Sequence, residues 1–193
     1  QAFETGLPTT SFQGLSKPPQ GGFFLPVCRA WKGRCYGQSD MGLSRAGAAH
    51  ARELAGALAG WRPERVVHSG LRRAAILGES VAALAGVAAH ADPAWQERDF
   101  GSWEGRSWAS IYRETGSAMD GMIDDPDGFR PGGGETTMAF AARALAAFHS
   151  QPCGRIMIIT HGGPIAAIAG SLKGLPPRDW LALVPALGGS LEF

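Results

Sequence analysis

One stretch near the end of the chain constrains the fold more than any other. Residues 156–159 are wholly apolar, and three of the four are isoleucine. A short uncharged run of this kind is typical of a strand buried on both faces of a parallel sheet. The polar residues Thr160 and His161 follow at once, and then two glycines permit a tight turn. Because Pro164 suits the first position of a helix, the stretch predicts a strand that leads directly into a helix.

His161 stands at the junction between this strand and this helix. In open α/β sheets ligands bind at the carboxyl ends of the strands, and a helix amino terminus favours anions. A lone histidine at such a point can also be no more than the polar end of a core strand. The adjacent pair of glycines favours the first interpretation, so we expect His161 to take part in an anion site.

Composition excludes several classes of function. The 193 residues are 45% hydrophobic and 18% charged, with a net charge of +1, so charge alone indicates neither nucleic-acid nor membrane binding. The three cysteines form no CxxC pair, which predicts neither a disulfide framework nor a zinc site and favours a reducing, cytoplasmic setting. We see no run as long as a membrane span and no signal-peptide pattern.

The alternation of strand-like and helix-like segments predicts a three-layer α/β/α sandwich with a mostly parallel sheet. Residues 1–22 have the composition of an irregular arm, so we expect one domain over residues 23–193. Loops are expected at 33–40 and 95–105, and a lid or connection at 120–134. The expected strands are 23–28, 65–68, 87–91, 156–159 and 190–193. The expected helices are 45–59, one that starts within 69–74 and runs through about 85, 108–115, 136–149 and 179–183.

Three junctions of the predicted sheet carry polar groups: Arg72 and Arg73 after the second strand, Glu97 after the third, and His161. Parallel strands place such junctions on one edge of the sheet. The planar fork of an arginine suits phosphate, and a carboxyl group flanked by aromatic residues can act as a general acid. The plainer alternatives are that both arginines are solvated and that Glu97 is a surface carboxylate.

Four segments, in order, are similar to the motifs of the histidine phosphatase superfamily, also called phosphoglycerate mutase-like. They are 69–74 (Ser-Gly-Leu-Arg-Arg-Ala), 97–105 (Glu-Arg-Asp-Phe-Gly-Ser-Trp-Glu-Gly), 131–136 (Pro-Gly-Gly-Gly-Glu-Thr) and 160–163 (Thr-His-Gly-Gly). The resemblance extends from about Phe23 to the end of the chain. It implies the phosphoglycerate mutase-like fold and hydrolysis of a phosphomonoester, with a small phosphorylated metabolite as the partner.

The resemblance also implies roles for individual residues. Arg73, which directly precedes Ala74, corresponds to the second arginine of the family, and His161 to its second histidine; together they hold the phosphoryl oxygens. Glu97 corresponds to the acid that protonates the leaving oxygen. Gly162, Arg29 and Gln38 are further candidates for phosphate or substrate binding. The mechanism that the resemblance implies requires no metal and no cofactor.

A finer resemblance concerns residues 33–37, which with Asp40 are similar to the α-ribazole phosphatase branch of the family. That branch removes phosphate from a cobalamin precursor. The loop therefore suggests α-ribazole-5'-phosphate as a substrate. It is a single loop, and polar residues such as Gln38 and Asp40 are also common in loops without a function of this kind.

The sequence departs from the family at the nucleophile, a histidine that follows an arginine at the end of the first strand. The family's usual spacing back from Gly33 places Phe24 at the position of the nucleophile and Phe23 at the position of its arginine. If Arg29 is matched to that arginine instead, Ala30 stands at the position of the nucleophile. A phenylalanine has no lone pair with which to attack phosphorus.

Three explanations remain open: the chain is a catalytically inactive relative that binds a phosphorylated ligand, residues 23–24 reflect an altered start or a reading-frame error, or another group has replaced the nucleophile. His161 and His68 are the candidates for such a replacement, although His68 is also explained as a satisfied histidine at a strand end. A phosphoglycerate mutase-like phosphotransferase is a third reading of the function, and it needs the phosphoenzyme even more.

Overall fold

The computed structural model of the chain describes residues 31–185, 189 and 192. The predicted arm at 1–22 and the predicted strand at 23–28 lie outside these residues, and so does the last predicted strand except for residue 192. Phe23, Phe24 and Arg29 are therefore also outside the described part of the chain.

The described sheet has three strands, and all of its pairings are parallel. The order is β2-β1-β3, with β1 in the middle. The bounds of β1 and β3 are those predicted, whereas β2 is shorter than the predicted 87–91. The reason is the end of the preceding helix, where Gly86 is left-handed and the N–H of Val87 donates to the carbonyl of Ala82 instead of joining the sheet. The strands are β1 (Arg65–His68), β2 (Ala89–Ala91) and β3 (Ile156–Ile159).

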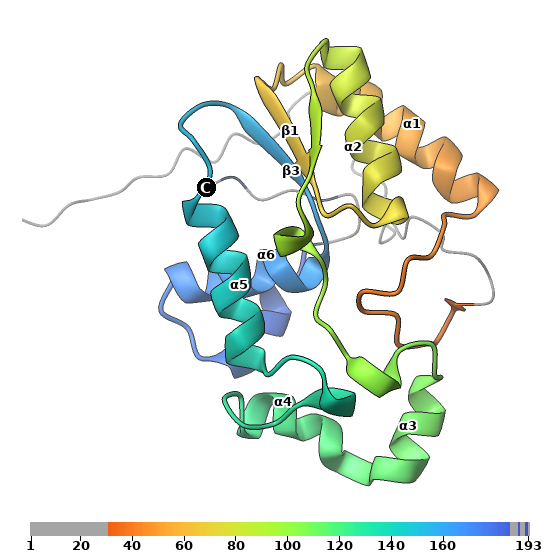
Figure 1. Cartoon of the computed structure of the whole chain (residues 1–193), viewed down its shortest axis with the longest axis vertical. Helices are drawn as coiled ribbons and strands as arrows, with labels where there is room; N and C mark the ends of the chain where they lie inside the picture. The colour runs from red at the N-terminus through yellow and green to blue at the C-terminus, as the bar shows by residue number, and fades with distance from the viewer. Residues whose placement is uncertain (1–30, 186–188, 190–191, 193) are drawn as a thin grey trace, which may run out of the picture.

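Helices cover both faces of this sheet, as predicted (Figure 1). Because successive strand residues point to opposite faces, Val66 packs against α1 and α2, whereas Val67 packs with residues of α5 and α6. Trp95 and Ile168 are buried beside Val67 in the second of these cores. The three-layer arrangement is thus confirmed. The covering helices are α1 (Arg45–Ala59), α2 (Arg72–Ala85), α5 (Thr137–His149) and α6 (Gly162–Leu172).

Side-chain caps explain why several helices begin where the sequence predicts. The hydroxyl of Ser44 accepts from the N–H of Gly47 at the start of α1, and Ser107 does the same for Ser110 at the start of α3 (Trp108–Thr115). Thr136, predicted as the first residue of its helix, is instead the cap residue of α5. Each cap satisfies an N–H group that has no acceptor within the helix.

The start of α6 differs from the prediction. His161 is the cap position and the helix begins at Gly162, so Pro164 is its third residue and not its first. This position is still compatible with proline, because the first four N–H groups of a helix have no partner inside it. The shift matters for the site, because it brings His161 directly against the helix amino terminus.

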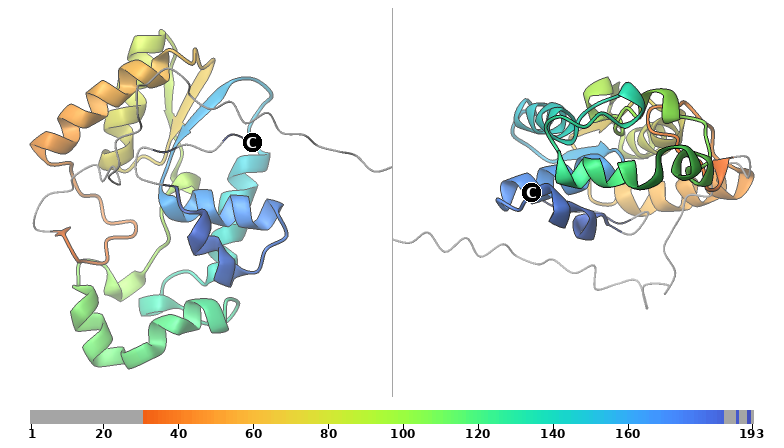
Figure 2. Two further views of the ribbon diagram at one scale, coloured as in Figure 1. Left: turned by 180° about the vertical axis from the view of Figure 1, so that it is seen from behind. Right: turned by 90° about the horizontal axis from the view of Figure 1, so that it is seen from below.

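The segment 100–135 lies beyond the carboxyl ends of the strands (Figures 1 and 2). It encloses a small core in which Cys35, Trp103 and Ile111 are buried. The predicted loop with aromatic anchors is confirmed, and the predicted connection at 120–134 contains short helical turns. Its elements besides α3 are η3 (Gly101–Trp103), η4 (Gly116–Asp120), α4 (Gly121–Asp124) and η5 (Pro131–Gly133).

The helix predicted at 179–183 is a 3₁₀-helix, η6 (Pro177–Leu183). Two consecutive prolines at its start remove backbone donors, and the bonds that form span three residues, as from the N–H of Asp179 to the carbonyl of Pro176. Trp180 of η6 is buried against α6, where its indole N–H donates to the carbonyl of Leu175.

Two helical glycines provide a matched test of this packing. A methyl group at Gly170 in α6 would overlap the indole of Trp180, whereas one at exposed Gly56 in α1 would meet nothing within 4 Å. We expect Gly170→Ala to lower the free energy of unfolding by ~1–3 kcal/mol through overpacking. Gly56→Ala should raise it by ~0.5–1 kcal/mol through backbone entropy. Urea unfolding followed by circular dichroism measures both, and a change of the same sign in the two variants would contradict this packing.

Candidate active site

The site begins where β1 and β3 end side by side. The N–H of Ser69 donates to the carbonyl of Ile159 over 3.2 Å, which extends the pairing of the two strands by one residue. Two residues after Ile159, the ring Nε2 of His161 lies 2.9 Å from the hydroxyl oxygen of Ser69. The two strand ends thereby fix the orientation of the imidazole.

The environment of His161 keeps its imidazole neutral. Burial of the ring lowers its pKa from 6.5 to about 3, and the positive charges of Arg73 and Arg143 act in the same direction. A neutral ring carries one N–H donor and one acceptor nitrogen. At physiological pH it can therefore donate a hydrogen bond without bringing a second positive charge to the site.

Of the two predicted arginines, only Arg73 reaches the interior. Its side chain is 7% exposed, and its guanidinium donates to the carbonyls of Ser39 and Gly37 over 2.8 and 2.6 Å. The group also lies over the ring of Tyr36, 5.3 Å from the ring centre. Arg72 is exposed, and its backbone N–H donates to the carboxylate of Asp40. Within the described residues two of the five N–H donors of Arg73 are used.

Glu97 is held at the amino terminus of α6. One carboxylate oxygen accepts from the N–H of Gly163 over 3.2 Å, and the other from the N–H of Arg98 over 2.9 Å. A methyl group on Gly163 would overlap this carboxylate. Glycine at position 163 therefore lets the carboxylate of Glu97 approach the helix terminus beside His161.

Gln38 supports the site from behind. Its side-chain amide donates to the backbone carbonyl of Glu97 over 3.1 Å, so in this structure it holds the loop of Glu97. The same short segment is fixed by Glu104, whose carboxylate accepts from the N–H of Gln38 and the hydroxyl of Ser39 over 2.9 and 2.6 Å. Because Ser39 in turn accepts from Arg73, Glu104 also helps to place that guanidinium.

The structure thus brings most of the candidate residues together. Gln38, Arg73, Glu97 and His161 come from separate parts of the chain and meet at one edge of the sheet, and Gly162 follows His161 as the first residue of α6. Two further candidates, Phe24 and Arg29, lie outside the described residues.

His68 faces away from this group. It follows Val66 on the strand by two residues, so its side chain points to the same face, where it packs against Gly78 of α2. Its Nδ1 accepts from the N–H of Gly70 over 3.1 Å, and burial lowers its pKa. This is the arrangement of a satisfied histidine at a strand end.

Three residues of the site were not singled out from the sequence: Ser69, Glu135 and Arg143. Alternation along β1 could have identified Ser69, because it shares the face of Val67 and so points toward α6. Glu135 lies inside one of the quoted motifs and forms an ion pair with Arg143, with 2.8 Å between Arg143 Nε and Glu135 Oε1. Arg143 had no such signal beyond being a cation in a helix rich in alanine.

Among the described residues, no group of three or more histidine, cysteine, aspartate or glutamate side chains is arranged to hold a metal ion. No helix among these residues has the length and apolar character needed to cross a membrane.

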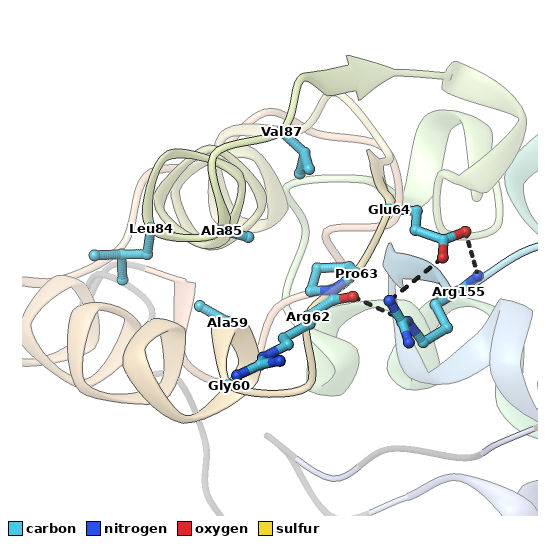
Figure 3. A pocket seen from close by; sticks show the side chains of 9 residues that line it. All are labelled: Ala59, Gly60, Arg62, Pro63, Glu64, Leu84, Ala85, Val87 and Arg155. Atoms are coloured by element: carbon cyan, nitrogen blue, oxygen red, sulfur yellow. Dashed lines mark hydrogen bonds and ion pairs between the residues drawn. The ribbon is translucent and has the colours of Figure 1, made fainter.

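A cavity of about 690 Å³ lies at the amino-terminal ends of β1 and β3, opposite the candidate site (Figure 3). Arg62 and Arg155 both line it, and the guanidinium of Arg155 donates to the carbonyl of Arg62 over 3.1 Å and lies 3.3 Å from a carboxylate oxygen of Glu64. None of Arg73, Glu97 and His161 lines this cavity, so it is separate from the candidate active site.

Comparisons with known proteins agree with the geometry. A curated relative, glucosyl-3-phosphoglycerate phosphatase of Mycobacterium tuberculosis, is 31% identical over 168 residues, which cover 81% of this chain and 73% of that protein. The structure of a mycobacterial glucosyl-3-phosphoglycerate phosphatase with inorganic phosphate superposes with a TM-score of 0.66 at 31% identity, over 77% of each chain.

The α-ribazole phosphatase of Shigella flexneri has a TM-score of 0.66 at 24% identity, over 80% of this chain and 79% of that one, so it shows a shared fold alone. The sequence profile of the Histidine phosphatase superfamily (branch 1) matches residues 29–189. This match covers all four motifs and the residues that meet at the site. The chain therefore belongs to the histidine phosphatase superfamily.

Proposed function

We propose that the chain is a phosphomonoester hydrolase that acts on a small phosphorylated metabolite. The observation that carries the proposal is the meeting of three groups at one edge of the sheet: the buried guanidinium of Arg73, the neutral imidazole of His161 and the carboxyl of Glu97. A cation and a neutral donor can hold a phosphoryl group, and a carboxyl group can protonate the leaving oxygen; the nucleophile is not among these three groups.

Each group has a distinct task in this proposal. Arg73 and His161 hold the phosphoryl oxygens, because both offer donors at the end of the sheet and one of them carries a full positive charge. The amino terminus of α6 adds the partial positive charge of its free N–H groups. Glu97 in its protonated form gives its proton to the leaving oxygen, which avoids release of an alkoxide.

The identity of the metabolite has two candidates. The relatives at about 31% identity are named for glucosyl-3-phosphoglycerate, which makes that compound the first to test. Residues 33–37 and Asp40, which suggested α-ribazole-5'-phosphate, also stabilise the fold through backbone hydrogen bonds. The backbone of Cys35 exchanges hydrogen bonds with Arg106 and Gly105, and Asp40 binds the backbone of Arg72. We also propose a cytoplasmic setting, because Cys35 and Cys153, the two cysteines within the described residues, form no disulfide there.

A non-catalytic phosphate-binding protein is the second candidate function. All five histidines of the chain are described, and only His161 lies among the site residues. His50, His90 and His149 belong to α1, β2 and α5, and His68 faces α2. We therefore propose that the nucleophilic histidine of the family's phosphohistidine mechanism is absent and that Phe24 occupies its position.

An assay of three proteins distinguishes the two functions. The unmodified chain, Phe24→His and the double variant Phe23→Arg with Phe24→His are compared on glucosyl-3-phosphoglycerate and α-ribazole-5'-phosphate. If Phe24 occupies the nucleophile position, the double variant should gain at least ~10³-fold in turnover and form a phosphohistidine visible by intact mass. Full turnover by the unmodified chain with no gain would contradict the Phe24 assignment. If none of the three proteins hydrolyses either compound but all of them bind phosphate, the result would support the non-catalytic phosphate-binding function.

Adjacent arginines provide a matched test of the phosphate pocket. Arg73→Met removes a buried cation that faces the site, whereas Arg72→Met removes an exposed one. We expect Arg73→Met to weaken the binding of inorganic phosphate by roughly 10- to 100-fold, since a hydrogen bond to a charged group is lost. Isothermal titration calorimetry measures the change. Equal weakening in the two variants would place the phosphate elsewhere.

The neutral state of His161 has a consequence for stability against pH. Below about pH 6.5 the unfolded chain protonates this histidine, whereas the folded chain does so only near pH 3, so the free energy of unfolding falls as the pH falls between these values. His161→Gln removes this contribution and should flatten the decline. The exposed His149→Gln is the control and should follow the unmodified chain. Urea unfolding from pH 7 to pH 4 tests this, and an unchanged slope in His161→Gln would show that the ring is not held neutral.

A further inference from the structure

Arg143 on α5 uses every donor that its side chain has. Its Nε and one terminal nitrogen bind the two carboxylate oxygens of Glu135, each over 2.8 Å. The remaining N–H groups donate to the backbone carbonyls of Ala94, Gln96 and Glu97 over 2.8, 3.0 and 3.2 Å. All five N–H donors of an arginine are thus satisfied, and three of them hold the loop that carries Glu97.

Glu135 holds the same loop from the other side of Glu97. Its carboxylate accepts from the N–H of Asp99 over 3.0 Å, and its own N–H donates to the carbonyl of Asp99 over 2.9 Å. The ion pair therefore binds the backbone both before and after Glu97. The guanidinium of Arg143 also lies over the ring of Phe140, 5.4 Å from its centre, which fixes it to the body of α5.

The loop has no other regular support at this point. Residues 97–100 belong to no helix or strand, so no ladder of backbone hydrogen bonds sets their course. The carboxylate of Glu97 itself makes two bonds, to the backbone of Arg98 and of Gly163. The position of this carboxylate consequently follows the position of its backbone, which the ion pair holds together with the side-chain amide of Gln38.

We propose that Arg143 and Glu135 are a positioning pair that holds the carboxyl of Glu97 against the N–H of Gly163 and in line with the leaving oxygen. The role at the leaving oxygen rests on the proposed phosphatase function. The placement against Gly163 does not, because it concerns a contact that exists without substrate. The positive charge of Arg143 is also felt by His161, whose pKa it helps to lower.

The amide resonance of Gly163 reports the placement directly. In nitrogen-15 spectra of the full chain, Glu97→Gln should move this resonance, because it removes the charged acceptor of the Gly163 N–H. We expect Arg143→Met and Glu135→Gln to move it as well. The control is Arg155→Met, which breaks an ion pair with Glu64 at the other end of the sheet (Figure 3) and should leave the resonance in place.

Kinetics tests the consequence for proton donation, in whichever of the proteins of the phosphatase assay turns over. A general acid contributes ~10²–10⁴-fold, and the contribution is largest for leaving groups that are poor without a proton. We expect both positioning variants to lose roughly 100-fold in kcat/KM on an alkyl phosphate but less than 10-fold on p-nitrophenyl phosphate. Inhibition by inorganic phosphate should weaken much less than turnover of the alkyl phosphate, because Arg73 and His161 remain although Arg143→Met removes one nearby positive charge.

The outcomes separate this inference from the proposed function. An unmoved Gly163 resonance in folded Arg143→Met and Glu135→Gln, or equal losses on both substrates, would overturn the positioning role. If none of the proteins hydrolyses a phosphate ester but the Gly163 resonance moves as expected, the proposed phosphatase function is wrong and the placement of Glu97 stands. Glu135→Gln keeps the shape of the side chain, so it provides the test if Arg143→Met does not fold.

Discussion

The site depends on the parallel pairing of β1 with β3 in one register. His68 lies opposite Ile159, and the N–H of Ser69, the residue after β1, continues this alignment by donating to the carbonyl of Ile159. Alternation along the strand then decides which side chain faces which layer. His68 turns toward α2 and Ser69 toward His161. A shift of one residue would exchange the two, and the imidazole of His161 would lose its partner.

Glycines let the backbones of segments 97–105 and 131–136 pack in direct contact. A methyl group at Gly101 would overlap the carbonyl of Gly132, one at Gly132 would overlap that of Phe100, and one at Gly134 would overlap that of Asp99. Gly101 and Gly132 also have positive φ angles of 52° and 60°. The close approach brings Glu135 beside Asp99, so Glu135 holds the loop of Glu97 in addition to the direct bonds from Arg143 of α5.

Local signals explain what could be predicted from the sequence. The bounds of α1, α2 and α3 follow from residues within one turn, such as the caps Ser44 and Ser107 and the left-handed Gly86. The acceptors of Arg143 lie up to 49 residues away along the chain, and no periodicity or spacing connects them. Phe24 and Arg29, in contrast, stay predictions because they lie outside the described residues.

The pKa of His161 reports the electrostatic character of the site. Burial is the main reason for its depression, and the remaining part comes from Arg73 and Arg143, two cations from different layers of the fold. A potential that opposes a proton on the imidazole favours an anion at the same place. The chain as a whole has a net charge of only +1, so this potential is local. Arg73 is buried and Arg143 is held by fixed acceptors, so neither has to reorganise when a phosphoryl group binds.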